Sequence, residues 1–185
     1  MRHGLQGRDR EWLAGVFDQY GVLLRAFAIR RVGPDSADDI VSEVFAIAWR
    51  RRAEVPEPTL PWLYQTTRHV VLHHHRSRAR QSVLTDAVAV GQRERSAASA
   101  EDQSRSVVDS ILDGLDPTDA EVMRLTVWEQ LTPAEIAVVL QLSPGAARNR
   151  LMRARRRALE LYESSLSDVS ACHSRPSVEP CPTLS

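Results

Sequence analysis

Apolar residues in this chain recur at intervals of three and four positions. Between residues 36 and 49, Ile40, Val44 and Ile47 fall on one stripe of a helix. In the segment after Pro144, Ala147, Leu151, Ala154 and Ala158 follow the same rule. No stretch of useful length alternates with the period of a strand, so the sequence predicts an all-α protein.

Capping residues mark where the predicted helices begin. A cap supplies a side-chain acceptor for the free N–H groups of the first turn, and proline fits the first helical position. Asp116-Pro117 and Ser143-Pro144 combine both signals, and Thr132 to Glu135 is a capping box with proline inside it. Ser36 to Asp39 predicts a further cap, ahead of the stripe that begins at Ile40.

A stretch without aromatic residues divides the chain. Residues 81–106 are rich in Ala, Ser and Gln, which is typical of a linker with at most weak local order. After Tyr162 the sequence is rich in Ser and Pro and loses its apolar periodicity, so 164–185 is expected to form a flexible tail. The sequence therefore predicts two small helical domains, 1–80 and 107–163.

Charge is distributed unevenly over the 185 residues. The 24 basic residues are all arginine and balance 24 acidic ones, which excludes a uniformly basic surface. Residues 148–157 nevertheless hold six arginines and no acid, whereas residues 81–135 hold four arginines and 11 acids. Segregation of this kind is typical of separate faces that meet separate partners.

The sequence also predicts a cytoplasmic protein. No window reaches the roughly 18 apolar residues of a membrane span, and the N-terminus leads into no apolar signal segment. The two cysteines, Cys172 and Cys181, lie close together near the C-terminus, so no disulfide framework is expected. With His173 they could form a thiol or metal sensor, but the signal is weak and an inert tail is favoured.

Two short predicted helices, 133–140 and one from Pro144, are joined at Gln141-Leu142, the pattern of a helix-turn-helix. Ala147 and Leu151 begin the buried stripe of the second helix. We expect its opposite face to lie in the major groove of DNA. The alternative is a solvated arginine-rich helix, which is less favoured because six like charges repel one another unless an anion offsets them. The candidate DNA-reading residues are Arg148, Asn149, Met152, Arg153 and Arg156.

The run from Leu131 to Leu159 resembles region 4 of the extracytoplasmic-function (ECF) sigma factors of the sigma-70 superfamily, which reads the promoter minus-35 element. Ala146-Ala147 stand where the family usually has Thr-Val, which removes a hydroxyl that could reach a phosphate.

The first half carries two further motifs of the same family. Asp38 to Phe45, followed by Trp49, resembles region 2.2, whose helix docks on the clamp helices of the RNA polymerase β′ subunit. The resemblance implies that polymerase is bound by Asp38, Asp39, Glu43, Phe45 and Trp49.

Residues Trp62 to Arg76 are similar to the family's region 2.4. Region 2 must hold unstacked bases of a melted strand, which calls for planar groups and arginine. Residues 50–59 occupy the family's specificity loop, and His69 and His73 stand where Asn and Asp are usual, so an altered minus-10 preference is expected. The implied minus-10 residues are Arg52, Thr59, Trp62, Arg68, His69, His73 and Arg76.

The resemblance implies an initiation factor without catalytic residues or cofactor. Its partners would be the polymerase core, mainly the β′ clamp helices but also β, together with promoter DNA and commonly an anti-sigma factor. A polymerase-independent helix-turn-helix regulator is the alternative, and the region 2 motifs argue against it. A metalloenzyme using His69 and His73 lacks a Glu or Cys at ligand spacing, so no metal site is expected.

Overall fold

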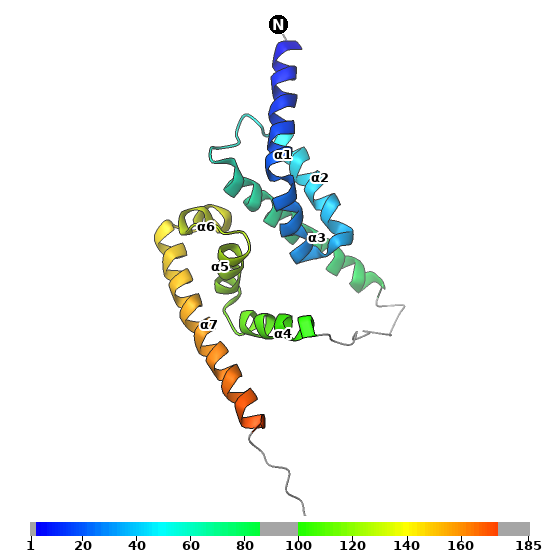
Figure 1. Cartoon of the computed structure of the whole chain (residues 1–185). Helices are drawn as coiled ribbons and strands as arrows, with labels where there is room; N and C mark the ends of the chain where they lie inside the picture. The colour runs from blue at the N-terminus through cyan, green and yellow to red at the C-terminus, as the bar shows by residue number, and fades with distance from the viewer. Residues whose placement is uncertain (1–2, 86–99, 174–185) are drawn as a thin grey trace, which may run out of the picture. The chain divides into compact units, whose positions relative to one another are not determined.

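The computed structural model describes residues 3–85 and 100–173 (Figure 1). Within these ranges the chain is helical and contains no strand, which confirms the all-α class. None of the described helices is long and apolar enough to cross a membrane. The helices are α1 (His3–Val32), α2 (Pro34–Arg50), α3 (Thr59–Thr85), α4 (Ala100–Asp113), α5 (Pro117–Val127), α6 (Pro133–Leu140) and α7 (Pro144–His173).

A single residue, Gly33, separates α1 from α2. It adopts a positive φ of 81°, which glycine accepts without a steric penalty, and Pro34 then supplies a first helical residue with φ already set. No side chain caps α2, so the cap predicted at Ser36 to Asp39 is wrong. The helix begins before Ser36 because the Gly-Pro pair already defines its start.

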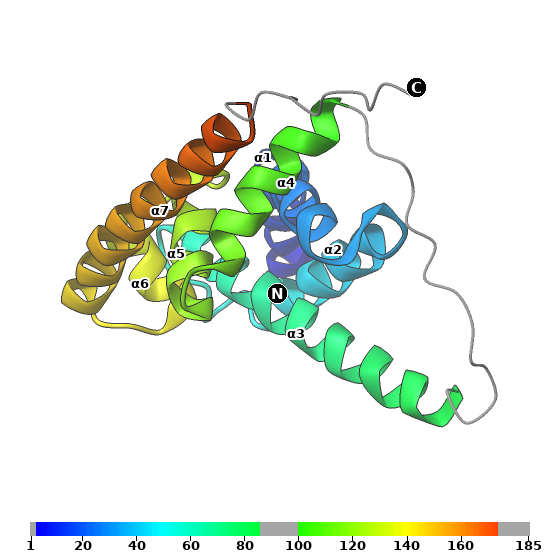
Figure 2. The ribbon, with the colours of Figure 1, turned by 90° about the horizontal axis from the view of Figure 1, so that it is seen from below.

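The first of two compact units contains α1, α2 and α3 together with residues 124–148. Its core is built around Leu24, Phe27, Leu63 and Tyr64, all of which are buried. The rings of Phe27 and Tyr64 lie 5.2 Å apart, and α6 packs against α3. The C-terminal part of α3 extends beyond α1 and α2 (Figure 2), and most of the side chains at positions 73–80 are exposed.

The second unit contains α4, the first turns of α5, and α7 from Asn149 onward. Leu112, Leu115 and Ala120 form its core, and Leu161 of α7 packs against them. Gly114 allows this close approach, because a Cβ there would lie 2.7 Å from Cδ1 of Leu161.

Helix boundaries differ from the prediction at three places. Helix α3 ends at Thr85 and α4 begins at Ala100, so both enter the segment predicted as a linker, 81–106. Helix α7 continues to His173, past the end predicted near Tyr162, because no glycine or proline occurs between residues 146 and 175. Cys181 and the rest of the predicted tail beyond His173 lie outside the described residues.

Candidate functional site

The predicted helix-turn-helix is present, and local hydrogen bonds hold each part of it. The Glu135 backbone N–H donates to Thr132 Oγ1 at 3.3 Å and the Thr132 N–H donates to the Glu135 carboxylate at 2.8 Å, which completes the capping box of α6. Gln141 takes the left-handed conformation, and the Leu142 N–H donates to the Ala137 carbonyl. Ser143 Oγ accepts from the N–H of Ala146 and caps α7.

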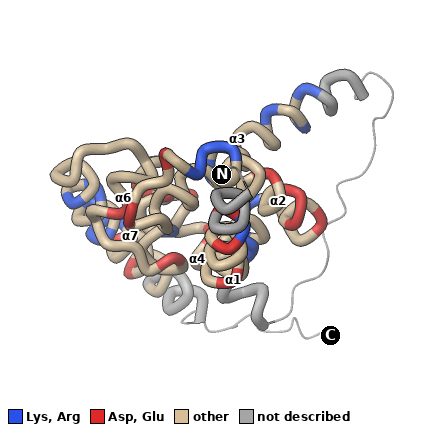
Figure 3. The backbone as a smooth tube through the Cα atoms, turned by 90° about the horizontal axis from the view of Figure 1, so that it is seen from above, with Lys and Arg blue, Asp and Glu red and all other residues tan. Residues whose placement is uncertain are grey.

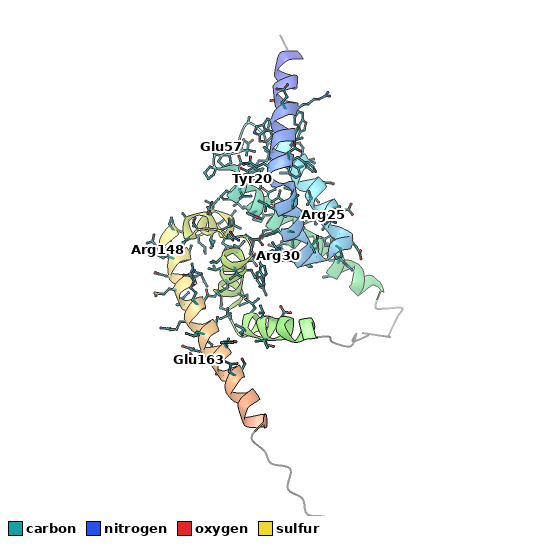
Figure 4. All side chains as sticks on the ribbon, viewed as in Figure 1. Tyr20, Arg25, Arg30, Glu57, Arg148 and Glu163 are labelled. Carbon is teal, nitrogen blue, oxygen red and sulfur yellow. The ribbon has the colours of Figure 1, made fainter. Side chains whose placement is uncertain are left out.

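Helix α7 divides into a buried stripe and an exposed face, as predicted. Ala147, Leu151 and Ala154 are buried. The side chain of Met152 is 65% exposed, and Arg148 projects near the start of the helix (Figure 4). All five predicted reading residues are exposed: Arg148, Asn149, Met152, Arg153 and Arg156.

Acidic residues offset part of the arginine charge on α7. Arg150 Nη1 donates to Asp119 Oδ1 at 2.7 Å and to Asp116 Oδ1 at 3.3 Å. Asp116 also accepts from the backbone N–H groups of Thr118 and Asp119, and these bonds, the Thr118 one foremost, lower its pKa. The hydrogen bond to Asp119 raises the pKa of Arg150. Arg150 therefore joins α7 to the first turn of α5 and is less exposed than the five predicted reading residues.

The remaining acidic partners of this helix lie nearby. Arg153 Nη2 is 3.9 Å from Asp119 Oδ1, and Glu160 lies 3.1 Å from Arg157 and 3.9 Å from Arg156. Four of the six arginines at 148–157 thus have a carboxylate within 4.0 Å. For those four, internal carboxylates offset part of the like-charge repulsion that the sequence predicts.

Helix α3 gathers part of the predicted minus-10 set on one face. His69, His73 and Arg76 are exposed at positions i, i+4 and i+7, while Arg68 is half-buried. Thr59 and Trp62 are buried instead. The Thr59 hydroxyl is hydrogen-bonded to the Pro56 carbonyl and to the Glu57 carboxylate, so it holds the turn that precedes α3.

The histidine run, His73 to His75, lies on α3. No group of three or more His, Cys, Asp or Glu side chains is placed to hold a metal ion among the described residues. The rings of His74 and His75 lie 6.1 Å apart, edge to face.

Three consecutive arginines, Arg50 to Arg52, span the end of α2 and the turn that follows it. Arg52 is held toward α1, because its Nε lies 2.7 Å from the Asp9 carboxylate and its guanidinium lies 4.9 Å from the ring centre of Trp49. Arg51 pairs with Glu54 at 2.8 Å. A cavity of about 570 Å³ opens beside this turn, and its walls are Asp9, Trp12 and residues 50–54.

Helix α2 presents an acidic stripe beside an apolar groove. Asp38, Asp39 and Glu43 are exposed on it, and acidic positions follow one another along α2 in Figure 3. Phe45 is only 7% exposed and packs 5.0 Å from the ring of Phe17. The groove has a volume of about 710 Å³, and its walls are Arg10, Leu13, Ala14, Phe17, Asp18, Phe45, Ala46 and Trp49.

A buried ion pair in the first unit was not evident from the sequence. Glu129, in the turn between α5 and α6, has a side chain 2% exposed and lies 2.6 Å from Arg30 and 3.5 Å from Arg31 (Figure 4 labels Arg30). Burial raises the pKa of Tyr64 to about 12, and the charge of Glu129 and a hydrogen bond with Glu129 add to this rise. The partners are about 100 positions apart, so no local pattern could have paired them.

Known protein families match both halves of the chain. Residues 16–81 match the model for Sigma-70 region 2, and residues 105–157 match the model for Sigma-70, region 4. The two matches together cover well over half of the chain. The chain is 32% identical over 130 residues to a probable RNA polymerase sigma factor, RfaY, of Xanthomonas campestris pv. campestris. That match covers 65% of this chain and 32% of RfaY, so the chain spans about a third of this curated relative.

Two solved structures resemble the fold. The sigma factor RpoE of Bartonella quintana, solved with the anti-sigma factor NepR, is 24% identical with a TM-score of 0.56, over 80% of this chain and 96% of RpoE. CnrH, solved with the cytosolic domain of CnrY, is 23% identical with a TM-score of 0.58, over 84% of this chain and 90% of CnrH. These likenesses show a shared helical fold.

Proposed function

The chain belongs to the sigma-70 family, and from that premise we propose that it is an ECF-type sigma factor, which binds the RNA polymerase core and directs initiation at specific promoters. The observation that carries the proposal is that region 2 and region 4 occur in order in one helical chain, each with an exposed charged face. The protein acts by binding and carries out no catalytic step. It works in the cytoplasm, where the polymerase is.

The polymerase contact is assigned to α2. An acidic stripe beside an apolar groove offers charge for steering and apolar surface for burial. Asp38, Asp39 and Glu43 are the exposed charges that would meet the β′ clamp helices. Phe45 and Trp49 both form part of the groove wall, and Trp49 is half-buried.

Promoter contacts are assigned to two helices. The exposed face of α7 would lie in the major groove at the minus-35 element, with Arg153 at its centre. On α3, His69, His73 and Arg76 would meet the melted minus-10 strand. Thr59 and Trp62 support that face from within, and Arg52, held by Asp9, would reach DNA from the side of α1.

Charge reversal tests the polymerase contact. Asp39→Arg together with Glu43→Arg should abolish co-purification of the full chain with core polymerase and leave helicity unchanged by circular dichroism. Asp109→Arg with Asp113→Arg is the matched control, because these residues form an exposed acidic pair at the same spacing on α4. Retained binding by the α2 variant, or equal loss by the control, would contradict the assignment.

Two arginine substitutions test the minus-35 contact in the holoenzyme. Arg153→Ala should cost about 1 to 3 kcal/mol and relax preference at one or two base pairs. Arg157→Ala should weaken all duplexes alike and lower the salt dependence of binding. Equal losses on every sequence from both variants would show that α7 does not lie in the groove in this way.

The complete helix-turn-helix also fits a regulator that needs no polymerase. A DNA-binding assay separates the two functions, because such a regulator binds its site by itself, whereas the proposed sigma factor selects promoters as part of the holoenzyme. We also propose an anti-sigma factor as a third partner, since the similar RpoE was solved with one. Co-purification from the source cell, followed by competition against core polymerase, tests that partner.

A further inference from the structure

Asp119 occupies an unusual position for an acidic residue beside a DNA-reading face. It lies in the first turn of α5 and is 9% exposed. Its Oδ1 accepts a hydrogen bond from Arg150 at 2.7 Å and lies 3.9 Å from Nη2 of Arg153. One nearly buried carboxylate thus stands between an arginine that braces the helix and an arginine at the centre of the exposed face.

The two arginines differ in how free they are to move. The Arg150 side chain is 30% exposed and also pairs with Asp116, whereas the Arg153 side chain is 54% exposed. At 3.9 Å, Arg153 is attracted to Asp119 without being fixed by a short hydrogen bond. A guanidinium in this state is biased in direction and partly neutralised, yet its donors stay available to a base edge.

We infer that Asp119 determines how strictly the minus-35 sequence is read, by restraining Arg153. This inference rests on the proposed function, in which the exposed face of α7 enters the major groove. Phosphates attract arginine in any sequence, whereas a guanine edge is recognised by two donors in fixed directions. By lowering the effective charge of Arg153 and orienting it, Asp119 weakens non-specific phosphate contact more than base contact.

The test compares Asp119→Asn with the matched control Asp116→Asn in holoenzyme made with the full chain. Both changes remove one negative charge near Arg150, and Asn at 116 still caps α5. Duplexes selected by the parent from a library randomised at minus-35, and scrambled duplexes, serve as probes. Asp119→Asn should lower the ratio of specific to scrambled affinity about five-fold, or about 1 kcal/mol, and steepen the salt dependence. Asp116→Asn should leave the ratio near that of the parent.

A double-mutant cycle separates this role from a structural one. In an Arg153→Ala background, Asp119→Asn should change the ratio no further, because the residue through which it acts is gone. An equal fall in that background, or an equal fall for Asp116→Asn, would overturn the inference and assign Asp119 to the Arg150 brace. Thermal unfolding of each variant checks that it folds. If the Asp119→Asn variant folds poorly, Asp119→Ser provides a second neutral variant.

The same data distinguish failure of the inference from failure of the proposed function. If Arg153→Ala leaves the selected duplexes bound as before, α7 does not read the minus-35 element and the proposed function loses this contact. If Arg153→Ala costs specificity but Asp119→Asn does not, the proposed function stands and only the inference about Asp119 is wrong.

Discussion

Replacing Glu129 with Gln should destabilise the first unit far more than neutralising an exposed acid does. The Glu129 side chain is 2% exposed and meets Arg30 at 2.6 Å and Arg31 at 3.5 Å. Gln keeps the size and one oxygen acceptor but removes the charge. The substitution therefore leaves two guanidinium groups facing a neutral amide, one of them with a side chain only 12% exposed.

The expected loss in the free energy of unfolding depends on whether each arginine can reach water after Glu129 is replaced. Removing one partner of a fully buried ion pair costs about 3 to 5 kcal/mol, mainly because the other charge stays buried. Arg30 has a side chain 32% exposed and can turn to water, whereas Arg31 stays above the Phe27 ring at 3.5 Å. We therefore expect about 2 to 3 kcal/mol, since only one arginine remains poorly hydrated.

Urea denaturation of the full chain, followed by circular dichroism and tryptophan fluorescence, measures this loss. Glu54→Gln is the control, because Glu54 also pairs with an arginine, at 2.8 Å, but its side chain is 63% exposed. The control should change the free energy of unfolding by no more than about 0.5 kcal/mol. If Glu129→Gln stays within that range too, the reasoning that burial makes this pair costly to break is refuted.

Three further outcomes are expected. Because burial and Glu129 raise the pKa of Tyr64 from 10 to about 12, this contribution to stability should be fully present below pH 10 and be lost as the pH rises through 12, at a cost on the order of 3 kcal/mol. Unfolding measured against pH should show this decline in the parent and not in Tyr64→Phe. Gln141→Gly should stabilise the protein by about 0.5 to 1 kcal/mol in urea denaturation, because the left-handed conformation at Gln141 suits glycine, and a loss of stability would contradict this account. His69→Asn should change the minus-10 base preferred in a promoter-library selection without weakening polymerase binding, and an unchanged preference would remove His69 from the DNA contact.

Features decided within one helical turn could be predicted from the sequence. The capping box at Thr132 and the cap at Ser143 depend on residues three positions apart, and both occur. The buried stripe of α7 follows from helical periodicity, which the structure confirms. The start of α2 was missed because two local signals competed, and Gly33-Pro34 outweighed Ser36.

The spacing of apolar residues predicts which face of a helix is buried, but it does not predict where the helix ends. After Tyr162 the apolar stripe fades, yet α7 continues to His173 because nothing in its sequence breaks a helix. The same reasoning explains why α3 and α4 enter the segment predicted as a linker.

Motif resemblance predicts where the interfaces lie but does not separate residues on the exposed faces from buried ones. Phe45, Thr59 and Trp62 belong to the motifs, yet all three are buried. A family motif includes residues that contact a partner and also buried residues that pack beneath the contact surface. The distinction requires the packing of neighbouring helices, which depends on residues far away in the chain.

The arginine-rich helix shows why charge counts need the tertiary structure. Six arginines within ten residues suggested a helix that requires an external anion. The structure supplies internal anions to four of them, from Asp116, Asp119 and Glu160. Each internal pair lowers the number of phosphates that the helix must neutralise, so the salt dependence of promoter binding should be shallower than six arginines imply. We therefore infer DNA binding by α7 from the side chains on its exposed face, and not from the number of its arginines.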